Sequence, residues 1–337
     1  MYSFIRPWLF RLDAERAHAV TLRLLQLVGS FPALAALLRG LYAPPPTEPV
    51  ELFGLKFANN LGLAAGYDKD GMAWRGLACL GFGHIEIGTV TPRPQPGNPR
   101  PRVFRLVEDG ALINRLGFPS RGAACVARRL RGHRPKNLVL GVNLGINKYT
   151  PLDKAAEDYM ALVGVFSPLA DYLTINVSSP NTAGLRDLQQ SKQLSELLGE
   201  LSRHKTTPLL VKLSPDLEDA ELDKALDVLL QHKVDGVIAT NTTVTRPALT
   251  SPAANEAGGL SGAPLAGLCR RLVGRIYTRT QGRLPIVAAG GILSPQDADA
   301  AINAGASLVQ IFTGLIYRGP GLVKEILRAG SASPHYD

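Results

Sequence analysis

Apolar residues recur along the chain in short continuous runs, and each run is followed by a longer stretch with helical spacing of its apolar positions. Runs of four to six residues without alternation are typical of strands buried on both faces, hence of a parallel sheet joined by helices. About eight such units favour a closed (β/α)8 TIM barrel over an open doubly wound sheet. The predicted strands are Leu61–Ala65, His84–Gly88, Leu138–Val142, Tyr172–Val177, Leu209–Leu213, Gly236–Ala239, Ile286–Ala289 and Leu308–Phe312.

The pattern before the barrel differs and predicts an N-terminal helical extension. Asp13 is placed to cap a helix whose apolar positions fall on one side, and Pro32 opens a second short helix that ends near Gly40. Amphipathic helices of this kind pack on their own domain more often than they lie in a membrane interface. The predicted division is a helical segment (1–42), a proline-rich linker (43–50), the barrel (51–330, opening with a hairpin that turns at Gly54) and a flexible tail (331–337).

Polar residues and glycines follow the predicted strands at corresponding positions. Since the carboxyl ends of barrel strands meet on one face, we expect these residues to build one shared site. A lone Asn after a strand is usually a turn former, but the recurrence around the ring favours a site. These residues are Gly66, Tyr67, Asp68, Lys69, Thr89, Asn143, Asn176 through Asn181, Lys212, Asn241, Thr242, Gly290, Gly291, Thr313 and Gly314.

Three features narrow the chemistry of this site. Glycines after the seventh predicted strand and Thr313 after the eighth stand where such barrels commonly bind a phosphate. Lys69 and Lys212 supply positive charge to a face with few acids, which suits an anionic ligand. The many carboxamides suit a planar ligand that carries both N–H and C=O groups. No metal-ligand cluster is evident and no His ends a strand, so redox chemistry on a bound cofactor is favoured over a Ser–His–Asp hydrolase.

The formal net charge of +9 is concentrated in two parts of the chain, residues 1–40 and the ten arginines of 93–134. Charge alone does not distinguish nucleic acid, anionic lipid or an acidic substrate as the partner. The three cysteines cannot form a disulfide framework and indicate a reducing compartment. The early apolar run 20–38 is interrupted by polar residues and is too broken to span a membrane or to be a secretory signal.

Several motifs together resemble those of dihydroorotate dehydrogenases, over about residues 4–328. The resemblance rests on their order and spacing, since each motif alone is only moderately specific. The motifs begin at Ala64 (AAGYDKDG), Asn114 (NRLGF), Asn176 (NVSSPNT), Lys212 (KLSP), Asn241 (NTT), Gly259 (GLSG) and Gly290 (GG).

The resemblance implies an FMN cofactor and a site for dihydroorotate or orotate. The residues implied for FMN are Ala65, Gly66, Tyr67, Asp68, Lys69, Thr89, Asn143, Asn176, Lys212, Thr240, Gly262, Gly291, Phe312 and Thr313. The residues implied for the substrate are Lys69, Asn114, Arg115, Leu116, Gly117, Phe118, Asn176, Asn181, Asn241 and Thr242.

The resemblance also implies a mechanism, in which a base removes the C5 proton of dihydroorotate while the C6 hydride passes to FMN. Soluble members of the family use Cys as this base and membrane-associated members use Ser; here the position is Ser179. A serine hydroxyl must pass its proton on. We therefore hypothesise a relay through Thr182 and a water near Phe118, under a loop over residues 182–192 that excludes solvent.

The membrane-associated class has an N-terminal helical pair that forms a quinone channel, and residues 12–18 resemble that segment. This resemblance outweighs the general preference for simple packing. It implies a membrane quinone as acceptor, His18 and Arg105 along its route, and an anionic membrane surface as the partner of residues 1–40. It further implies a monomer that binds no nucleic acid and sits peripherally on the cytoplasmic face of a bacterial inner membrane. Phe312 departs from the class, which usually has Tyr there.

Three alternatives are less favoured. A tRNA-dihydrouridine synthase would explain the basic charge by RNA binding, but that class uses a catalytic Cys and an additional RNA-binding domain. A non-catalytic phosphate- or flavin-binding barrel would explain the fold and the glycines without an enzymatic reaction. The soluble form of the same enzyme, linked to fumarate or NAD, is disfavoured by Ser179 and by the N-terminal helices.

Overall fold

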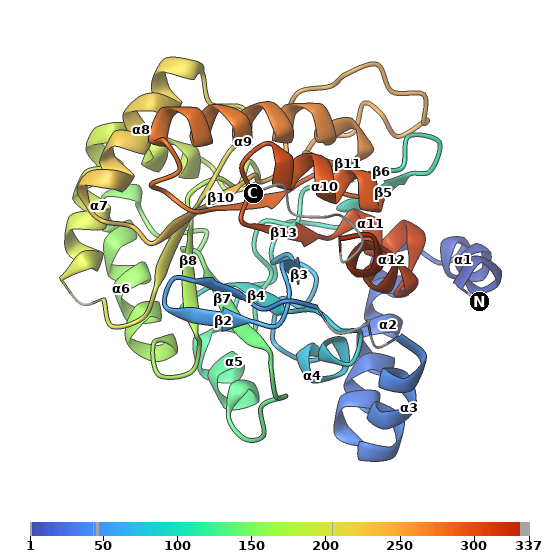
Figure 1. Cartoon of the computed structure of the whole chain (residues 1–337). Coiled ribbons are helices and arrows are strands. Elements are labelled where there is room, and N and C mark those ends of the chain that lie inside the picture. The colour runs from blue at the N-terminus through green and yellow to red at the C-terminus, as the bar shows by residue number, and fades with distance from the viewer. Residues whose placement is uncertain (1, 43, 45–46, 204, 331–337) are drawn as a thin grey trace.

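A computed structural model of the chain describes residues 2–42, 44, 47–203 and 205–330. Eight parallel strands close into a central barrel surrounded by helices, in the order β10-β12-β13-β3-β4-β7-β8-β9, with β9 pairing back to β10 (Figure 1). The predicted TIM barrel is therefore confirmed. The barrel strands are β3 (Leu61–Leu63), β4 (His84–Val90), β7 (Val139–Leu144), β8 (Tyr172–Asn176), β9 (Leu209–Leu213), β10 (Gly236–Ala239), β12 (Ile286–Ala289) and β13 (Leu308–Ile311).

The strands lie where the apolar runs predict them. The bounds of β9, β10 and β12 agree with the prediction, and those of the other five differ by one or two residues at an end. Every residue of the eight strands is buried, which explains why their sequences are continuous apolar runs. Their carboxyl ends meet at one mouth of the barrel.

Helices and short 3₁₀ turns follow the strands and cover the outside of the barrel. At α10, Ser294 caps the first turn by accepting a hydrogen bond from the Asp297 N–H at 3.2 Å, and Pro295 fills the first helical position. The helices are α4 (Trp74–Ala78), α5 (Ala123–Leu130), α6 (Ala155–Phe166), α7 (Ser191–Ser202), α8 (Asp219–Gln231), α9 (Ala266–Thr280), α10 (Pro295–Asn303), α11 (Thr313–Arg318) and α12 (Gly321–Gly330), with 3₁₀ turns η1 (Leu152–Lys154), η2 (Leu185–Gln189) and η3 (Ala263–Leu265).

Two small antiparallel sheets lie at opposite ends of the barrel. The predicted hairpin is present as β1 (Val50–Leu52) and β2 (Leu55–Phe57), and the fully buried Phe57 packs among the amino-terminal residues of the barrel strands. The second sheet, β5 (Val103–Leu106), β6 (Ala111–Asn114) and β11 (Gly259–Gly262), is absent from the sequence prediction. It carries Asn114 and Gly262 to the carboxyl-terminal mouth.

The N-terminal segment forms three helices rather than the two predicted. The additional helix, α1 (Tyr2–Arg11), precedes α2 (Ala14–Ser30), and α3 (Pro32–Tyr42) continues two residues past Gly40. The Asp13 cap is confirmed, since its carboxylate accepts hydrogen bonds from two backbone N–H groups of the first turn, each at 3.1 Å. α2 lies directly against α4, where a Cβ on Gly76 would stand 1.9 Å from the Leu25 carbonyl oxygen.

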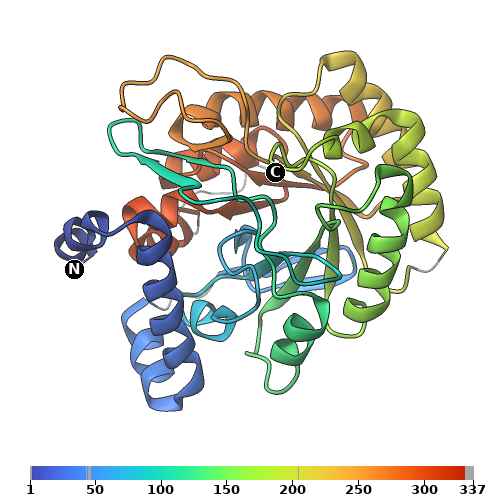
Figure 2. The ribbon, with the colours of Figure 1, turned by 180° about the vertical axis from the view of Figure 1, so that it is seen from behind.

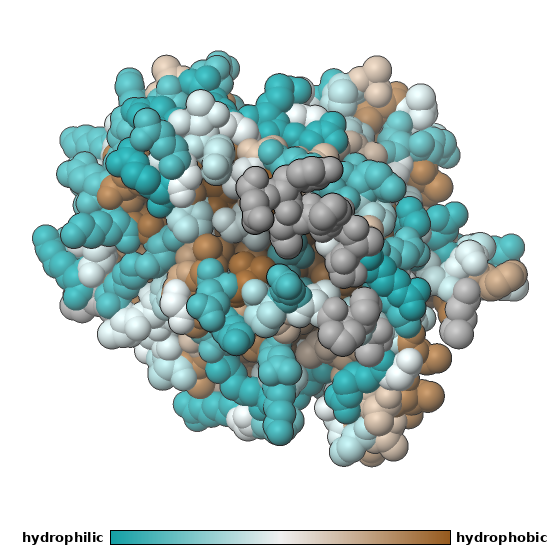
Figure 3. Space-filling view, in the orientation of Figure 1, coloured by the Kyte–Doolittle hydropathy of each residue, from teal (hydrophilic) through white to brown (hydrophobic). Residues whose placement is uncertain are grey.

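The three N-terminal helices project from one side of the barrel (Figure 2). They present apolar side chains to solvent, some of which form part of the surface in Figure 3. Of the exposed large hydrophobic residues in the described chain, eleven lie in residues 4–41, nine of them in these helices and two in the connections between them, and five lie elsewhere. No described helix alone is long and apolar enough to cross a bilayer; α2 and α3 pass that test only jointly, as a pair bent by 111°. The eleven residues are Phe4, Ile5, Trp8, Leu12, Val20, Leu24, Leu27, Phe31, Leu34, Leu37 and Leu41.

Part of the basic 93–134 stretch serves internal contacts. The buried Arg102 guanidinium pairs with Glu15 of α2 at 3.0 Å, and Arg105 donates to the Leu9 and Leu12 carbonyl oxygens at the end of α1. These arginines therefore attach the N-terminal helices to the barrel. The predicted tail, 331–337, and residues 43, 45 and 46 of the predicted linker lie outside the described residues.

Candidate active site

A large cavity opens at the carboxyl ends of the barrel strands and has an empty volume of about 1020 Å³, its mouth included. That size is at the upper end of the roughly 300–1,000 Å³ usual for small-molecule and cofactor sites. Most predicted site residues line it. They are Ala65, Gly66, Lys69, Thr89, Asn114, Leu116, Gly117, Phe118, Asn176, Ser179, Asn181, Lys212, Thr240, Asn241, Thr242, Gly262, Gly291, Phe312 and Thr313.

Seven of the residues implied for FMN, the substrate, the proton relay or the quinone route do not line the cavity. The buried Asp68 carboxylate accepts the Met72 and Ala73 N–H groups at 2.8 and 2.7 Å, and so orders the turn before α4. Asn143 accepts hydrogen bonds from Thr89 and Asn176, two residues that do line the cavity. The others are Tyr67, Arg115 and Thr182, together with the quinone-route pair His18 and Arg105, whose contacts lie outside the cavity.

At one end of the cavity, glycines allow backbone segments to approach each other closely. Gly291 has a left-handed φ of +73°, and a Cβ there would lie 2.2 Å from the Ala266 Cα. Next to it, Gly314 lies in the first turn of α11, and the hydroxyls of Ser261 and Thr313 lie 2.9 Å apart. Unobstructed N–H groups and two hydroxyls at one place suit a phosphate better than an apolar group. This is the end at which the sequence predicts a phosphate.

The floor of the cavity contains a buried cation above a buried carboxylate. Lys212, at the end of β9, is 6% exposed, and burial lowers the pKa of its ammonium while the nearby Glu86 carboxylate opposes the shift. Glu86 is fully buried in β4 and accepts hydrogen bonds from Asn143, Tyr172, Thr174 and Gln310 at 2.8–3.3 Å. This network orients the Glu86 carboxylate, whose electrostatic interaction with Lys212 favours the charged ammonium.

Amide side chains form a connected layer along one wall. Asn176 donates to Thr89 Oγ1 and to Asn143 Oδ1, each at 3.1 Å. Asn241 donates to Asn176 Oδ1 at 3.3 Å and to Ser178 Oγ at 2.9 Å. Each amide is oriented by its neighbours, which leaves a preorganised set of donors and acceptors facing the cavity.

Ser179 lies in this wall, 5% exposed, and its Oγ accepts the Asn181 N–H at 3.3 Å. Phe118 lines the cavity from the opposite loop, with a φ of +51°. Thr182 is buried nearby, but no direct hydrogen bond joins the Ser179 and Thr182 hydroxyls in the described chain. A relay between them therefore requires a bridging water, as the sequence hypothesis supposes.

Lys69 lies at the mouth side of the cavity and donates to the Gly66 carbonyl oxygen. Burial lowers the pKa of its ammonium to about 8, and the Asp70 carboxylate opposes that shift. The side chain is thus charged near neutral pH but close to its titration. It can bind an anionic substrate group without a paired acid competing for the charge.

A row of rings leads from the N-terminal helices to the cavity. The His18 ring of α2 meets the Tyr67 ring edge-on at 5.0 Å, and Tyr67 meets Phe312 at 5.7 Å. Phe312 lines the cavity. Burial, together with the Lys69 charge, lowers the pKa of His18 to about 3, so its imidazole is neutral at physiological pH. Arg105 lies at the end of α1, with its guanidinium 4.7 Å from the Phe10 ring centroid.

The fold and the cavity define a (β/α)8 barrel with a large ligand site at the carboxyl ends of its strands. The chain belongs to the dihydroorotate dehydrogenase family, because a family model of that description matches residues 49–330. It is 49% identical over 332 residues to a Roseiflexus protein named dihydroorotate dehydrogenase (quinone), with 97% of this chain and 92% of that one covered. It is also 50% identical over 339 residues to an Acidithiobacillus ferrooxidans protein of the same name, with 97% of this chain and 93% of that one covered.

A solved structure gives the same result. The crystal structure of DHODH from Eimeria tenella in complex with ferulenol superposes with a TM-score of 0.88 at 39% identity, covering 94% of this chain and 90% of that one. The family suggested by the sequence motifs is therefore confirmed, and the alternatives outside it are not favoured.

Several cavity residues were not predicted as site residues. Gln310 is the most informative, since it lines the cavity from β13 and its side-chain oxygen is buried without a hydrogen-bond partner in the described chain. In the sequence, Gln310 is marked only by being a polar residue inside an apolar run that predicts a strand, and the same is true of Glu86. The other lining residues that were not predicted are Ala64, Pro119, Ser261, Leu265, Ala289 and Ile292, whereas Gly290 and Gly314 line the cavity as the strand-end pattern predicted.

Proposed function

We propose that this chain oxidises dihydroorotate to orotate in pyrimidine biosynthesis, with FMN as its cofactor and a membrane quinone as the final electron acceptor. The observation that carries the proposal is the cavity itself. It combines a bare-backbone end, a central buried lysine and a wall of amides that ends in Ser179. The relatives named dihydroorotate dehydrogenase (quinone) support the reaction and its acceptor.

The residues present fit FMN. The phosphate would lie against Gly291, Gly314 and the Thr313 hydroxyl, where any side chain on either glycine would collide with backbone. The partnerless Gln310 oxygen and the Lys212 ammonium both face the same cavity floor and would bind the polar edge of a flavin ring. When bound, the flavin accepts a hydride from the substrate.

The chain itself would bind and orient the substrate. Lys69 would pair with the carboxylate of dihydroorotate, and the amides of Asn114, Asn176, Asn181 and Asn241 would hydrogen-bond the ring's N–H and C=O groups. Ser179 would take the C5 proton, and Thr182 with a bridging water would pass it on. Phe118 and the loop over 182–192 would keep bulk solvent away from this proton transfer.

The N-terminal helices would supply access for the quinone. Their exposed apolar side chains would enter a membrane interface, and nearby arginines would meet anionic lipid headgroups. The row of rings from His18 to Phe312 would mark the route toward the flavin. Phe312 offers no hydroxyl to a quinone there, so the preference among quinones differs from that of members with Tyr.

The test is dihydroorotate oxidation by the purified protein in detergent, with ubiquinone, menaquinone, fumarate and NAD compared as acceptors. We expect a yellow protein that turns over with a quinone and not with fumarate or NAD. Turnover with fumarate or NAD alone would contradict the quinone assignment. A colourless protein would support a non-catalytic barrel, and a flavin that dihydroorotate fails to reduce would refute the substrate.

Orotate affinity should depend on pH through Lys69. Its ammonium is charged below about pH 8, so binding of the orotate carboxylate is complete there and weakens as pH rises through that value, by up to roughly tenfold per unit. Titrating the holoenzyme with orotate between pH 7 and 9, followed by flavin absorbance, measures this. The Lys69→Met variant should bind weakly with no such dependence, and an unchanged slope in that variant would contradict the role.

A further inference from the structure

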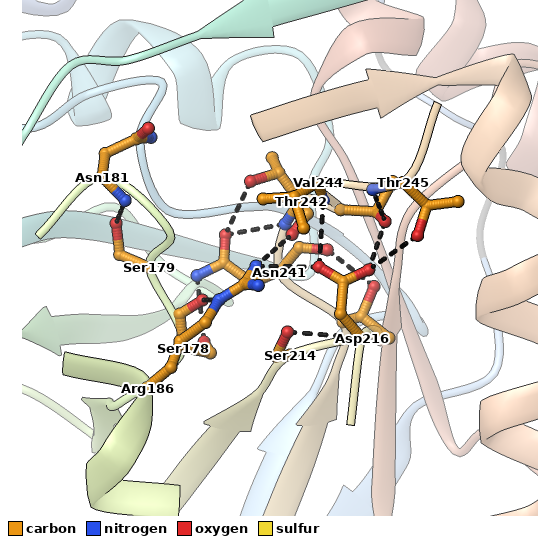
Figure 4. A network of polar contacts seen from close by, with 12 residues as sticks. Ser178, Ser179, Asn181, Arg186, Ser214, Asp216, Asn241, Thr242, Val244 and Thr245 are labelled. Atoms are coloured by element: carbon orange, nitrogen blue, oxygen red, sulfur yellow. Dashed lines mark hydrogen bonds and ion pairs between the residues drawn. The ribbon is translucent and has the colours of Figure 1, made fainter. Parts of the chain in front are cut away.

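In the loop that follows β8, Arg186 of η2 contacts two segments of the proposed site (Figure 4). Its Nε donates to the Ser178 carbonyl oxygen at 3.3 Å, and its Nη2 donates to the Thr242 carbonyl oxygen at 3.3 Å. Ser178 directly precedes the proposed base, and Thr242 belongs to the proposed substrate site. One guanidinium therefore joins the two segments between which the reaction would take place.

Asp216 fixes the direction of this guanidinium. Its Oδ2 lies 3.0 Å from Arg186 Nη2 and also accepts the Val244 N–H at 2.9 Å. Its Oδ1 accepts the hydroxyls of Thr243 and Thr245. The Arg186 side chain is 25% exposed and that of Asp216 is 13% exposed, so the pair is better shielded and more constrained than a surface ion pair.

The same loop has a second attachment to the end of β9. The buried Gln189 side chain accepts the Ser214 N–H at 2.8 Å, and Leu185 and Leu188 are buried beneath the loop. The loop therefore remains anchored when the arginine is removed. Arg186 additionally fixes the position of the Ser178–Ser179 backbone relative to Asn241 and Thr242.

We propose that Arg186, anchored by Asp216, is a positioning residue for proton abstraction, holding Ser179 at the correct place relative to the bound substrate. This inference rests on the proposed function. A shift of about 1 Å between reacting groups can cost on the order of 10²-fold in rate, so loss of this bridge is expected to slow the step that uses Ser179. The reoxidation of the flavin by quinone does not use Ser179 and is unaffected.

The experiment separates the two half-reactions in the FMN-bound protein. Arg186→Ala should slow flavin bleaching by dihydroorotate by roughly 10- to 100-fold, with reoxidation by a quinone unchanged. Arg186→Lys should recover part of the rate, because an ammonium can pair with Asp216 but cannot bridge both carbonyls. Arg203→Ala, which removes an exposed arginine paired with Glu200 on α7, is the matched control and should behave as wild type.

A double-mutant cycle tests whether the two residues act as one unit. Arg186→Ala with Asp216→Asn should bleach no more slowly than Arg186→Ala alone. Additive losses, a normal bleaching rate in Arg186→Ala, or an equal fall in both half-reactions with a lower midpoint would each overturn the proposal. If dihydroorotate fails to reduce the flavin of the wild-type protein, the proposed function itself is refuted. That outcome can be told apart from failure of the Arg186 proposal, because it is seen without any variant.

Discussion

Replacing Ser179 with Ala is expected to slow the reduction of bound flavin by dihydroorotate by about 10²- to 10⁴-fold, the usual contribution of a positioned general base. The side chain lines the cavity at 5% exposure, and its hydroxyl contacts only the Asn181 N–H among the described residues. Its removal therefore breaks one weak hydrogen bond and takes away the proton acceptor. Stopped-flow absorbance at the flavin band measures the rate, and the flavin should remain bound.

The control for this prediction is another serine. Ser195 of α7 hydrogen-bonds His232 at 2.9 Å, does not line the cavity, and should tolerate Ala with no change in flavin reduction. Ser179→Cys should retain more activity than Ser179→Ala, because a thiolate can accept the proton. A wild-type bleaching rate in Ser179→Ala would show that another group is the base.

The barrel was predictable because its strands are buried on both faces, which leaves a continuous apolar signature in β9, β10 and β12. The sheet of β5, β6 and β11 carries no comparable pattern, since its strands are four residues each and β11 comes from a part of the chain distant from the other two. The additional helix α1 was missed for a related reason. It contains Pro7 and most of its large apolar residues are exposed, so no buried stripe marks it.

The site could be predicted as a set of residues but not as a geometry. Asp68 and Lys69 are adjacent in one motif, yet the first caps a turn and the second lines the cavity. Sequence order does not reveal which of two neighbours faces inward when the backbone turns between them. Glu86 and Gln310 were overlooked because a single polar residue in an apolar strand gives no hint of its partners. The partners of Glu86 come from three other strands, β7, β8 and β13, all distant from it in the chain.

Introducing charge on the N-terminal helices is expected to abolish membrane binding while leaving the reduction of the bound flavin by dihydroorotate unchanged. Leu24 of α2 and Leu37 of α3 are 59% and 62% exposed and belong to the apolar surface of residues 4–41. Each leucine buried in an interface contributes about 1.5–3 kcal/mol. The variant Leu24→Glu/Leu37→Glu should therefore bind anionic vesicles at least about 10²-fold more weakly, and should lose turnover with vesicle-embedded quinone.

The flavin-reduction rate of this variant should match wild type, because neither side chain is buried in the barrel core. Tyr149→Glu/Val165→Glu provides the control, since it adds the same charge at exposed apolar positions on the barrel. Vesicle co-sedimentation and the two half-reactions give the measurement. Unchanged vesicle binding in Leu24→Glu/Leu37→Glu would mean that the apolar helices serve another partner. Both variants add two negative charges, but only Leu24→Glu/Leu37→Glu adds them to the N-terminal helices. An equal loss of vesicle binding in the control would therefore mean that net charge, and not the apolar surface, determines membrane binding.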